Sequence, residues 1–149
     1  IAIDNPYRLI RALEICIGSG QPYSSFKNKA KAPRPFASIK IGLNADREII
    51  YNRINQRVDI MLQEGLLEEA KALYPHKNLN ALQTVGYREL FSFFDGKITQ
   101  QFAIEEIKKN TRRFAKRQLT WFRKDKNIHW FDYQTAISEI VGKIVEMKE

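Results

Sequence analysis

The chain has 149 residues, of which 44% are hydrophobic and 28% are charged, and these proportions are typical of one globular domain of ordinary size. Its single cysteine, Cys16, excludes an internal disulfide and fits a reducing compartment, so we expect a cytoplasmic protein. No apolar run reaches the roughly 18 residues of a membrane-spanning helix, so we expect no membrane partner, and the net charge of +8 predicts a polyanionic one.

The first third of the chain predicts a helix, a loop and a strand. Asn5 followed by Pro6 is a typical helix start, and apolar residues then recur at helical spacing until Gly18. Residues 19–35 contain three prolines, three lysines and three serines, a composition that predicts a mobile loop. Residues 36–43 alternate between apolar and other side chains, which predicts a strand. One face of this strand carries Ile39, Ile41 and Leu43.

The rest of the chain predicts five helices and a second strand. The helices span Asn44 or Asp46 to about Glu64, the residues after Gly65 to about Tyr74, Gly86 to Phe94, Thr99 to about Lys124, and Thr135 to Met147. The strand spans Asn127 to Asp132. The first of these helices has an apolar stripe made of Ile50, Ile54, Val58, Met61 and Leu62. We therefore expect a mostly α chain with two or three strands.

Two strands far apart in the sequence do not form a stable sheet by themselves, because a sheet needs further strands or helix cover. The order of strand, helices and strand instead indicates two members of a larger α/β sheet. We hypothesise that the remaining strands belong to sequence outside this chain, which begins at Ile1 rather than Met. Cooperative unfolding of a stable 149-residue monomer would count against this hypothesis.

The excess positive charge lies in one segment, residues 108–126. This segment contains nine basic residues and one acid, Asp125, which leaves 16 basic and 16 acidic residues in the rest of the chain. The basic residues are Lys108, Lys109, Arg112, Arg113, Lys116, Arg117, Arg123, Lys124 and Lys126. Because Phe114, Trp121 and Phe122 are interleaved with them, the segment is typical of a surface that binds nucleic acid.

On the predicted helix, the basic and aromatic side chains of this segment separate onto different lines. Arg112, Lys116 and Arg123 lie near one line, and we expect this line to contact phosphates. A different line carries Phe114, Gln118 and Trp121, and we expect its rings to pack inward. The alternative is a solvated charged face above ordinary core aromatics.

A second basic group lies on the helix that follows the first strand. Arg53 and Arg57 are four residues apart, so both can reach one phosphorylated ligand beside the carboxyl edge of a parallel sheet. Arg47 lies on the same helix. The alternative is that these arginines are surface residues bonded to nearby acids, namely Asp46, Glu48 or Asp59.

Two shorter segments also combine basic and aromatic residues. Gly86 opens a helix, where a backbone can approach an anion closely, and Tyr87 and Arg88 could stack on a base and pair with a phosphate. Arg8 and Arg11 share one face of the first helix. The alternatives are a plain loop-to-helix junction and an ordinary amphipathic helix start.

The sequence lacks the common motifs for phosphate and metal chemistry. It contains neither the phosphate loop G-x-x-x-x-G-K-[ST] nor the dinucleotide motif G-x-G-x-x-G. His76 and His129 have no partners at metal-ligand spacing, and Cys16 lies on an apolar helical face that favours a core position. We therefore predict no catalytic and no metal-ligating residue in this chain.

Five segments, taken together and in this order, resemble the bacterial tRNA dimethylallyltransferases, which are also called tRNA isopentenyltransferases. They are N-P-Y-R-L-I-R-A-L-E (5–14), D-R-E-x-x-x-x-R-I-x-x-R (46–57), M-L-x-x-G-L-L-E-E (61–69), T-V-G-Y-R-E (84–89) and A-K-R-Q-L-T-W-F-R (115–123). The last motif is the most specific, and the resemblance extends from about Asn5 to about Asp132.

The resemblance implies an activity, a fold and two partners. Members of this family transfer a dimethylallyl group from dimethylallyl diphosphate to N6 of adenine 37, beside the anticodon of a tRNA. Their fold resembles P-loop kinases with a helical insertion that clamps the tRNA, and the target adenine is flipped out of its stack. The diphosphate is held by a phosphate loop and Mg²⁺.

Matching residue by residue implies roles for particular positions. Three segments resemble the tRNA-contacting stretches of the family: Tyr7, Arg8, Leu9, Ile10 and Arg11; Gln83, Thr84, Val85, Gly86, Tyr87 and Arg88; and Lys116, Arg117, Gln118, Leu119, Thr120, Trp121, Phe122 and Arg123. Arg57, with Arg53 beside it, matches the arginine that helps to hold the prenyl diphosphate.

The sequence departs from the family by lacking its N-terminal half, with the phosphate loop and the Asp thought to take the N6 proton. We therefore expect the C-terminal part of the enzyme, with residues 1–20 ending the tRNA-clamping insertion and residues 21–149 belonging to the P-loop-like core. The Mg²⁺ ligands should lie outside this chain, and the full-length enzyme should be a monomer. We predict that the 149 residues alone have no transferase activity, and measurable turnover of dimethylallyl diphosphate would refute this.

Two other functions stay open at this point. One is an RNA-binding module without chemistry, which a start codon near Ile1 would favour and an upstream phosphate loop would exclude. The other is an adenylate isopentenyltransferase, which acts on a free nucleotide and has no need for a long basic helix. Comparing the binding of an anticodon stem-loop with that of AMP would distinguish this enzyme from the tRNA-modifying one.

Overall fold

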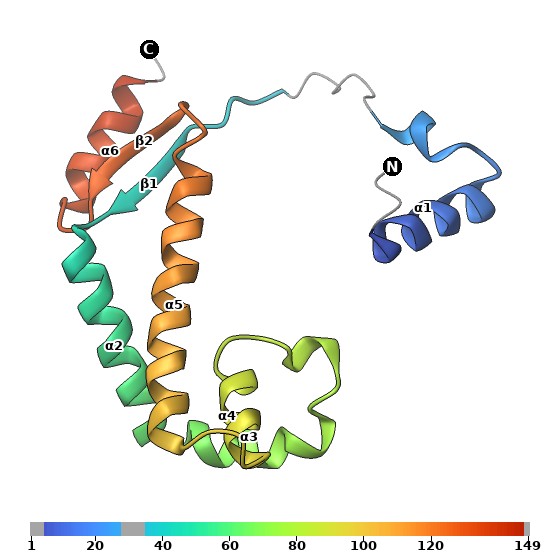
Figure 1. Cartoon of the computed structure of the whole chain (residues 1–149). Helices are drawn as coiled ribbons and strands as arrows, with labels where there is room; N and C mark the ends of the chain where they lie inside the picture. The colour runs from blue at the N-terminus through green and yellow to red at the C-terminus, as the bar shows by residue number, and fades with distance from the viewer. Residues whose placement is uncertain (1–4, 28–34, 148–149) are drawn as a thin grey trace. The chain divides into compact units, whose positions relative to one another are not determined.

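The computed structural model describes residues 5–27 and 35–147, and the chain divides into two compact units, Ile1–Ser38 and Ile39–Glu149. The first unit contains α1 (Pro6–Ser19) and a 3₁₀ turn (Tyr23–Phe26) (Figure 1). As predicted, Asn5 caps α1, because its side-chain oxygen accepts a hydrogen bond from the backbone N–H of Arg8 at 3.2 Å. The predicted loop 19–35 is replaced in part by the 3₁₀ turn, and its residues 28–34 lie outside the described residues.

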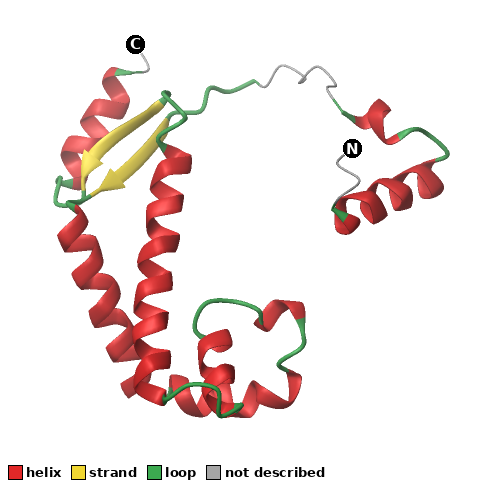
Figure 2. Ribbon diagram, viewed as in Figure 1, coloured by secondary structure: helices red, strands yellow, loops and turns green. Residues whose placement is uncertain are grey.

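The second unit contains a two-stranded parallel sheet, formed by β1 (Lys40–Asn44) and β2 (Ile128–Asp132) (Figure 2). Lys40 pairs with Ile128 at one end and Asn44 with Asp132 at the other. The prediction that the first strand begins at Phe36 is wrong, because β2 begins at Ile128 and offers no partner to the residues before Lys40. Leu43, on the apolar face of β1, is 57% exposed, so the described residues leave this face largely uncovered.

Two long helices connect the sheet to a helical module. α2 (Arg47–Gln63) leaves the end of β1, and α5 (Gln100–Phe122) returns antiparallel beside it toward β2 (Figure 1). Two contacts fix their register: Arg112 donates to Asn55 at 2.6 Å, and Lys108 forms an ion pair with Asp59 at 2.7 Å. The predicted cap of α5 is confirmed, because the Thr99 hydroxyl accepts from the backbone N–H of Phe102.

The hydrophobic core lies at the end of this helix pair that is remote from the sheet. There α3 (Leu66–Leu73) and α4 (Tyr87–Phe94) pack on α2 and α5, with short 3₁₀ turns at Tyr74–His76 and Asn80–Leu82 between them (Figure 2). The buried core residues are Val58, Leu66, Ala70, Leu90, Phe91, Ala103 and Ile107. α6 (Ile137–Glu146) follows β2, within the predicted bounds. The expectation of a mostly α chain with two strands is therefore confirmed.

Candidate nucleic-acid interface

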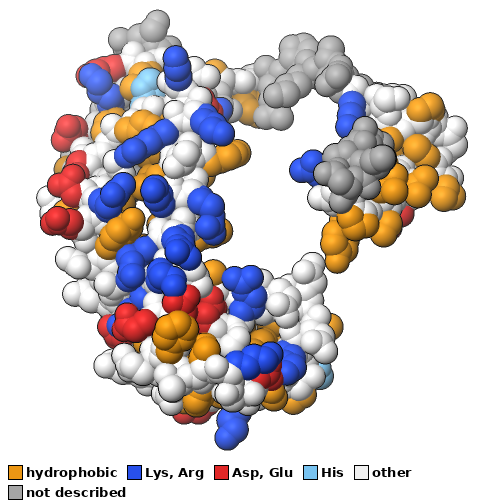
Figure 3. All heavy atoms as spheres, in the orientation of Figure 1, with side chains coloured by type: hydrophobic (Ala, Val, Ile, Leu, Met, Phe, Trp, Pro, Cys, Tyr) orange, Lys and Arg blue, Asp and Glu red, His pale blue; other side chains and the backbone are white. Residues whose placement is uncertain are grey.

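Most of the cations in residues 108–126 have no acidic partner among the residues that the structure describes. Lys108 pairs with Asp59 and Glu105, and Lys109 pairs with Glu106, whereas the other seven basic side chains form no ion pair there. The segment's one acid, Asp125, is bound by Lys40 at 2.5 Å. This ion pair, together with the backbone N–H of Asn127, lowers the pKa of Asp125. Its charge is thus already offset, and most of the cations in residues 108–126 stay open to a partner; Figure 3 shows Lys and Arg side chains gathered along this side of the second unit.

The expectation that the aromatic line of α5 packs inward is wrong. Phe114 is 56% exposed and Trp121 is 68% exposed, and the ring of Trp121 meets Phe122 edge-on at 5.0 Å. The guanidinium of Arg117 lies 5.8 Å from the centre of the Phe114 ring. The reason is that this half of α5 extends past the core, so α2 covers only one of its sides (Figure 1). Exposed rings among cations are the combination that binds stacked bases and phosphates together.

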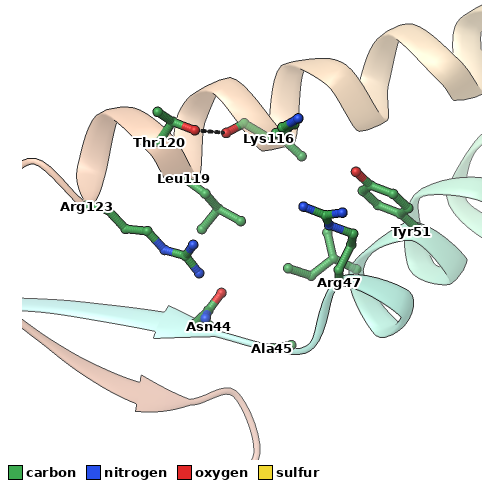
Figure 4. A pocket seen from close by; sticks show the side chains of 10 residues that line it. Asn44, Ala45, Arg47, Tyr51, Lys116, Leu119, Thr120 and Arg123 are labelled. Atoms are coloured by element: carbon green, nitrogen blue, oxygen red, sulfur yellow. Dashed lines mark hydrogen bonds between the residues drawn. The ribbon is translucent and has the colours of Figure 1, made fainter.

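A pocket of about 270 Å³ lies between the first turns of α2 and the last turns of α5 (Figure 4). Arg47 and Tyr51 of α2 line one side, and Lys116 and Arg123 of α5 line the other. The guanidinium groups of Arg47 and Arg123 both point into the space between the helices (Figure 4). At the end of β1, the side-chain oxygen of Asn44 is buried and has no hydrogen-bond partner in the described parts of the chain.

Arg53 and Arg57 lie together, as predicted, but in a different place from Arg47. Both line a second pocket of about 480 Å³ along α2, and the guanidinium of Arg53 stacks over Tyr133 at 4.9 Å. The alternative pairing with nearby acids is not found in the described residues, where Asp59 pairs with Lys108 instead. The helix thus presents two separate basic sites, because positions 47 and 53 face different sides of it.

The segment 83–88 is held against α5 by a buried acid. The Glu89 carboxylate accepts hydrogen bonds from the backbone N–H of Gly86 and the side-chain amide of Asn110, both at 2.8 Å. The Gly86 amide is therefore engaged within the protein, although its φ of 105° confirms the need for glycine there. Arg88 is exposed.

The ring of Tyr87 is also engaged within the protein. It stacks on Phe91, with the ring centres 6.0 Å apart, and is half-buried. The Tyr87 hydroxyl donates a hydrogen bond to Glu69, which raises the pKa of the tyrosine. In this structure Tyr87 therefore supports the segment 83–88, and the exposed residues of the segment are Gln83, Thr84 and Arg88.

The segment 7–11 belongs to the first unit. Tyr7, Arg8 and Ile10 are exposed, and Leu9 is half-buried. Arg11 is also exposed and forms an ion pair with Glu14 at 2.9 Å. Three of these side chains, Tyr7, Arg8 and Ile10, are thus open on the surface of the unit.

No group of three His, Cys, Asp or Glu side chains within residues 5–27 and 35–147 is arranged to hold a metal ion. None of the helices in these ranges is long and apolar enough to cross a membrane.

Sequence reasoning grouped Arg47 with Arg53 and Arg57 and did not single out Asn44 or Tyr51. These residues converge with Lys116 and Arg123 only through the antiparallel register of two helices, which is set by contacts 57 positions apart in the sequence. One pattern in the sequence could have indicated this arrangement. Positions 47, 51 and 55 carry polar groups at a spacing of four residues, which marks a second face of α2.

The fold and the surface together define a mostly helical protein with a parallel strand pair and an open basic surface. More specifically, the chain belongs to the IPP transferase family, because the model of that family matches residues 1–125. It is similar to the tRNA dimethylallyltransferases of Flavobacterium johnsoniae, with 67% identity over 97% of this chain, and of Christiangramia forsetii, with 69% identity over 94%. The matches cover 47% and 46% of those proteins, so the chain spans about half the length of the curated relatives it matches.

Solved structures show the same relationship. The tRNA isopentenylpyrophosphate transferase of Bacillus halodurans has a TM-score of 0.67 and 39% identity, and the match covers 99% of this chain and 45% of that one. The enzyme from Staphylococcus epidermidis has a TM-score of 0.68 and 33% identity, with 99% of this chain and 49% of that one covered. The half-length matches agree with the expectation that this chain corresponds to part of a longer enzyme.

Proposed function

We propose that the full-length protein transfers a dimethylallyl group from dimethylallyl diphosphate to N6 of adenine 37 of a tRNA, and that this chain supplies most of the contacts to the RNA. The observation that carries the proposal is the half of α5 beyond the core. There, cations without an acidic partner in the described residues share one surface with exposed rings, in a member of the IPP transferase family. The curated relatives are named tRNA dimethylallyltransferases.

The chemistry of this surface suits the anticodon arm of a tRNA. Arg113, Arg117 and Lys124 surround the exposed ring of Trp121 in a shallow surface pocket. Arginine forks and lysine ammonium groups bind phosphates, while an indole stacks on any base. We assign tRNA contact to residues 116–123, with support from the segments 83–88 and 7–11, whose exposed residues are Gln83, Thr84, Arg88, Tyr7, Arg8, Ile10 and Arg11.

The second basic site suits the leaving group of the reaction. As N6 forms its bond to the allylic carbon, the C–O bond to the diphosphate breaks and the electron pair stays on the diphosphate. The N6 proton passes to a base outside this chain, the Asp that the family resemblance implies. Arg57 and Arg53 lie together and form no ion pair in the described residues, although Glu64 also lines their pocket, so they can offset the growing negative charge. Stacking of Arg53 on Tyr133 holds its guanidinium in place for this role.

The remaining parts of the assignment concern the whole protein. Residues 1–20 would end the helical insertion that clamps the tRNA, and residues 21–149 would belong to the P-loop-like core, in a monomeric cytoplasmic enzyme. The described residues offer no cluster of metal ligands, so we assign no ligand of the expected Mg²⁺ to this chain and derive no step through the ion.

The test measures RNA affinity and product in the full-length protein. Fluorescence anisotropy should show salt-dependent binding of an anticodon stem-loop and far weaker binding of AMP. Nucleoside analysis by mass spectrometry should find the dimethylallyl group on adenine 37. Equal affinity for AMP and the stem-loop would favour an adenylate isopentenyltransferase, and RNA binding without product would favour a binding module; either result overturns the proposal.

A further inference from the structure

We infer that the pocket between α2 and α5 binds one phosphate group of the RNA backbone, separately from the site of the prenyl diphosphate. The pocket is formed by Asn44, Arg47, Tyr51, Lys116, Thr120 and Arg123. This inference rests on the proposed function. It assigns a role in RNA binding to Arg47, which lies outside the three segments proposed to contact the RNA.

Three cations from two helices meet in this pocket without an acid to balance them. Arg47, Lys116 and Arg123 all line it, and none of them forms an ion pair with a carboxylate in the described residues. No Asp or Glu is among the side chains that line the pocket. Cations brought together repel one another unless a bound anion offsets their charge, and a tetrahedral phosphate accepts hydrogen bonds from several donors at once.

The buried oxygen of Asn44 is a second, independent sign of an incomplete site. Buried polar atoms in folded proteins almost always have a hydrogen-bond partner, yet this oxygen has none in the described residues. Figure 4 shows the Arg123 guanidinium extending from α5 toward this side of the pocket. A phosphate bound by Arg123 would draw its guanidinium inward, where a remaining N–H can donate to the Asn44 oxygen.

The location of the pocket favours a backbone phosphate over the prenyl diphosphate. Lys116 and Thr120 line both this pocket and the surface pocket around Trp121, so the two pockets are neighbours along α5. The pocket shares no lining residue with the site of Arg53 and Arg57 on α2. An RNA strand that stacks a base on Trp121 would thus bring a phosphate to this pocket without entering the diphosphate site.

The first experiment removes one cation of the pocket at a time in the full-length protein. We expect Arg47→Gln and Arg123→Gln each to weaken binding of the anticodon stem-loop by about tenfold, since a hydrogen bond to a charged group is lost. Each change should also reduce the slope of log affinity against log salt by about 1. The KM for dimethylallyl diphosphate should stay the same. Arg47→Lys, which retains the charge, should recover part of the affinity.

The matched control is Lys143→Gln, which removes one positive charge from α6, outside the pocket. It should leave the affinity for the stem-loop close to that of the wild-type protein. Thermal melting of each variant reports whether the fold is retained, and the exposed positions of Arg47 and Arg123 make retention the expected result.

The second experiment identifies the phosphate. A series of stem-loops, each with one phosphate replaced by a neutral methylphosphonate, is bound to the wild-type protein and to Arg47→Gln. At one position the replacement should weaken binding to the wild-type protein but cause no further loss of binding to Arg47→Gln.

If the wild-type protein binds RNA while the Arg47 and Arg123 variants bind it equally well, the inference fails and the proposed function stands. If only the KM for dimethylallyl diphosphate rises, the pocket holds the diphosphate and the inference also fails. Loss of all RNA binding by the wild-type protein would instead overturn the proposed function, and the inference with it.

Discussion

The two ends of the α2–α5 helix pair differ in the pairing of their charged side chains and in the burial of their aromatic ones. At the core end, Asp95 is bound by Lys77 at 2.5 Å and by Lys97 at 2.8 Å, and Tyr74 packs edge-on against Phe91 and Phe94. At the sheet end, Arg113, Lys116 and Arg117 have no acidic partner in the described residues, and Trp121 is exposed. The comparison shows that the core end pairs its charged groups within the protein, whereas most cations at the sheet end have no acidic partner in the described residues.

Removing a core side chain should have the largest effect and should act on stability alone. Leu90, on α4, is fully buried in the core that this helix shares with α2, α3 and α5, so Leu90→Ala should lower the free energy of unfolding by about 2–5 kcal/mol. Urea denaturation measures this loss. The same substitution at the exposed Leu79 is the control and should change stability by less than about 0.5 kcal/mol. Equal losses at both positions would contradict the location of the core.

Removing two cations at the sheet end should act on RNA affinity alone. Lys116→Ala combined with Arg117→Ala should weaken binding of the anticodon stem-loop by about tenfold or more and flatten its salt slope by about 1 to 2. The melting temperature should change little, because both side chains are exposed. Unfolding of this variant with unchanged RNA affinity would show that the two side chains are structural.

Arg57→Ala separates the two basic sites of α2. In the full-length protein, the change should raise the KM for dimethylallyl diphosphate by about tenfold, because one charged contact to the diphosphate is lost. Affinity for the stem-loop should be retained, since Arg57 lies in a different pocket from Arg47. Steady-state kinetics with each substrate varied provide the measurement, and an unchanged KM with an unchanged kcat would remove Arg57 from the diphosphate site.

The smallest expected effect is a pH dependence of stability, which arises from Asp95 at the core end. Hydrogen bonds from Lys77, Lys97 and Tyr74 hold the pKa of Asp95 well below its usual range. A carboxyl whose pKa is lower in the folded state stabilises the fold above its unfolded value of about 3.9, and this contribution is lost as the pH falls toward the folded pKa. Stability measured by denaturation should therefore decline below about pH 4, and less steeply in Asp95→Asn. Identical pH profiles for the two proteins would exclude this role of Asp95.

Sequence reasoning succeeded where structure depends on local chemistry. The caps Asn5 and Thr99, the break at Gly65 and the start at Gly86 are all found where the sequence predicts them, because each depends on neighbouring residues. The stripe of α2 is also confirmed, since Val58 is buried and its other members are half-buried.

Prediction failed where burial depends on a partner distant in the sequence. The alternating pattern predicted only that Leu43 shares a face with Ile39 and Ile41, and a helical line predicted that Trp121 packs inward, but periodicity identifies only a shared face and not what covers it. In the same way, the division of Arg47 from Arg53 and Arg57 follows from the packing of α5 on one side of α2. The site was therefore predictable in composition but not in its arrangement into two pockets.

One helix belongs to both ends of the second unit. α5 runs for 23 residues without proline or glycine, so it is an unbroken rod about 35 Å long whose first turns are anchored in the core. A tilt of about 5° at the anchored end would displace the other end by about 3 Å, roughly the length of a hydrogen bond. Because this helix is stiff, tight packing around Ala103 and Ile107 also fixes the positions of Trp121 and Arg123 at its other end.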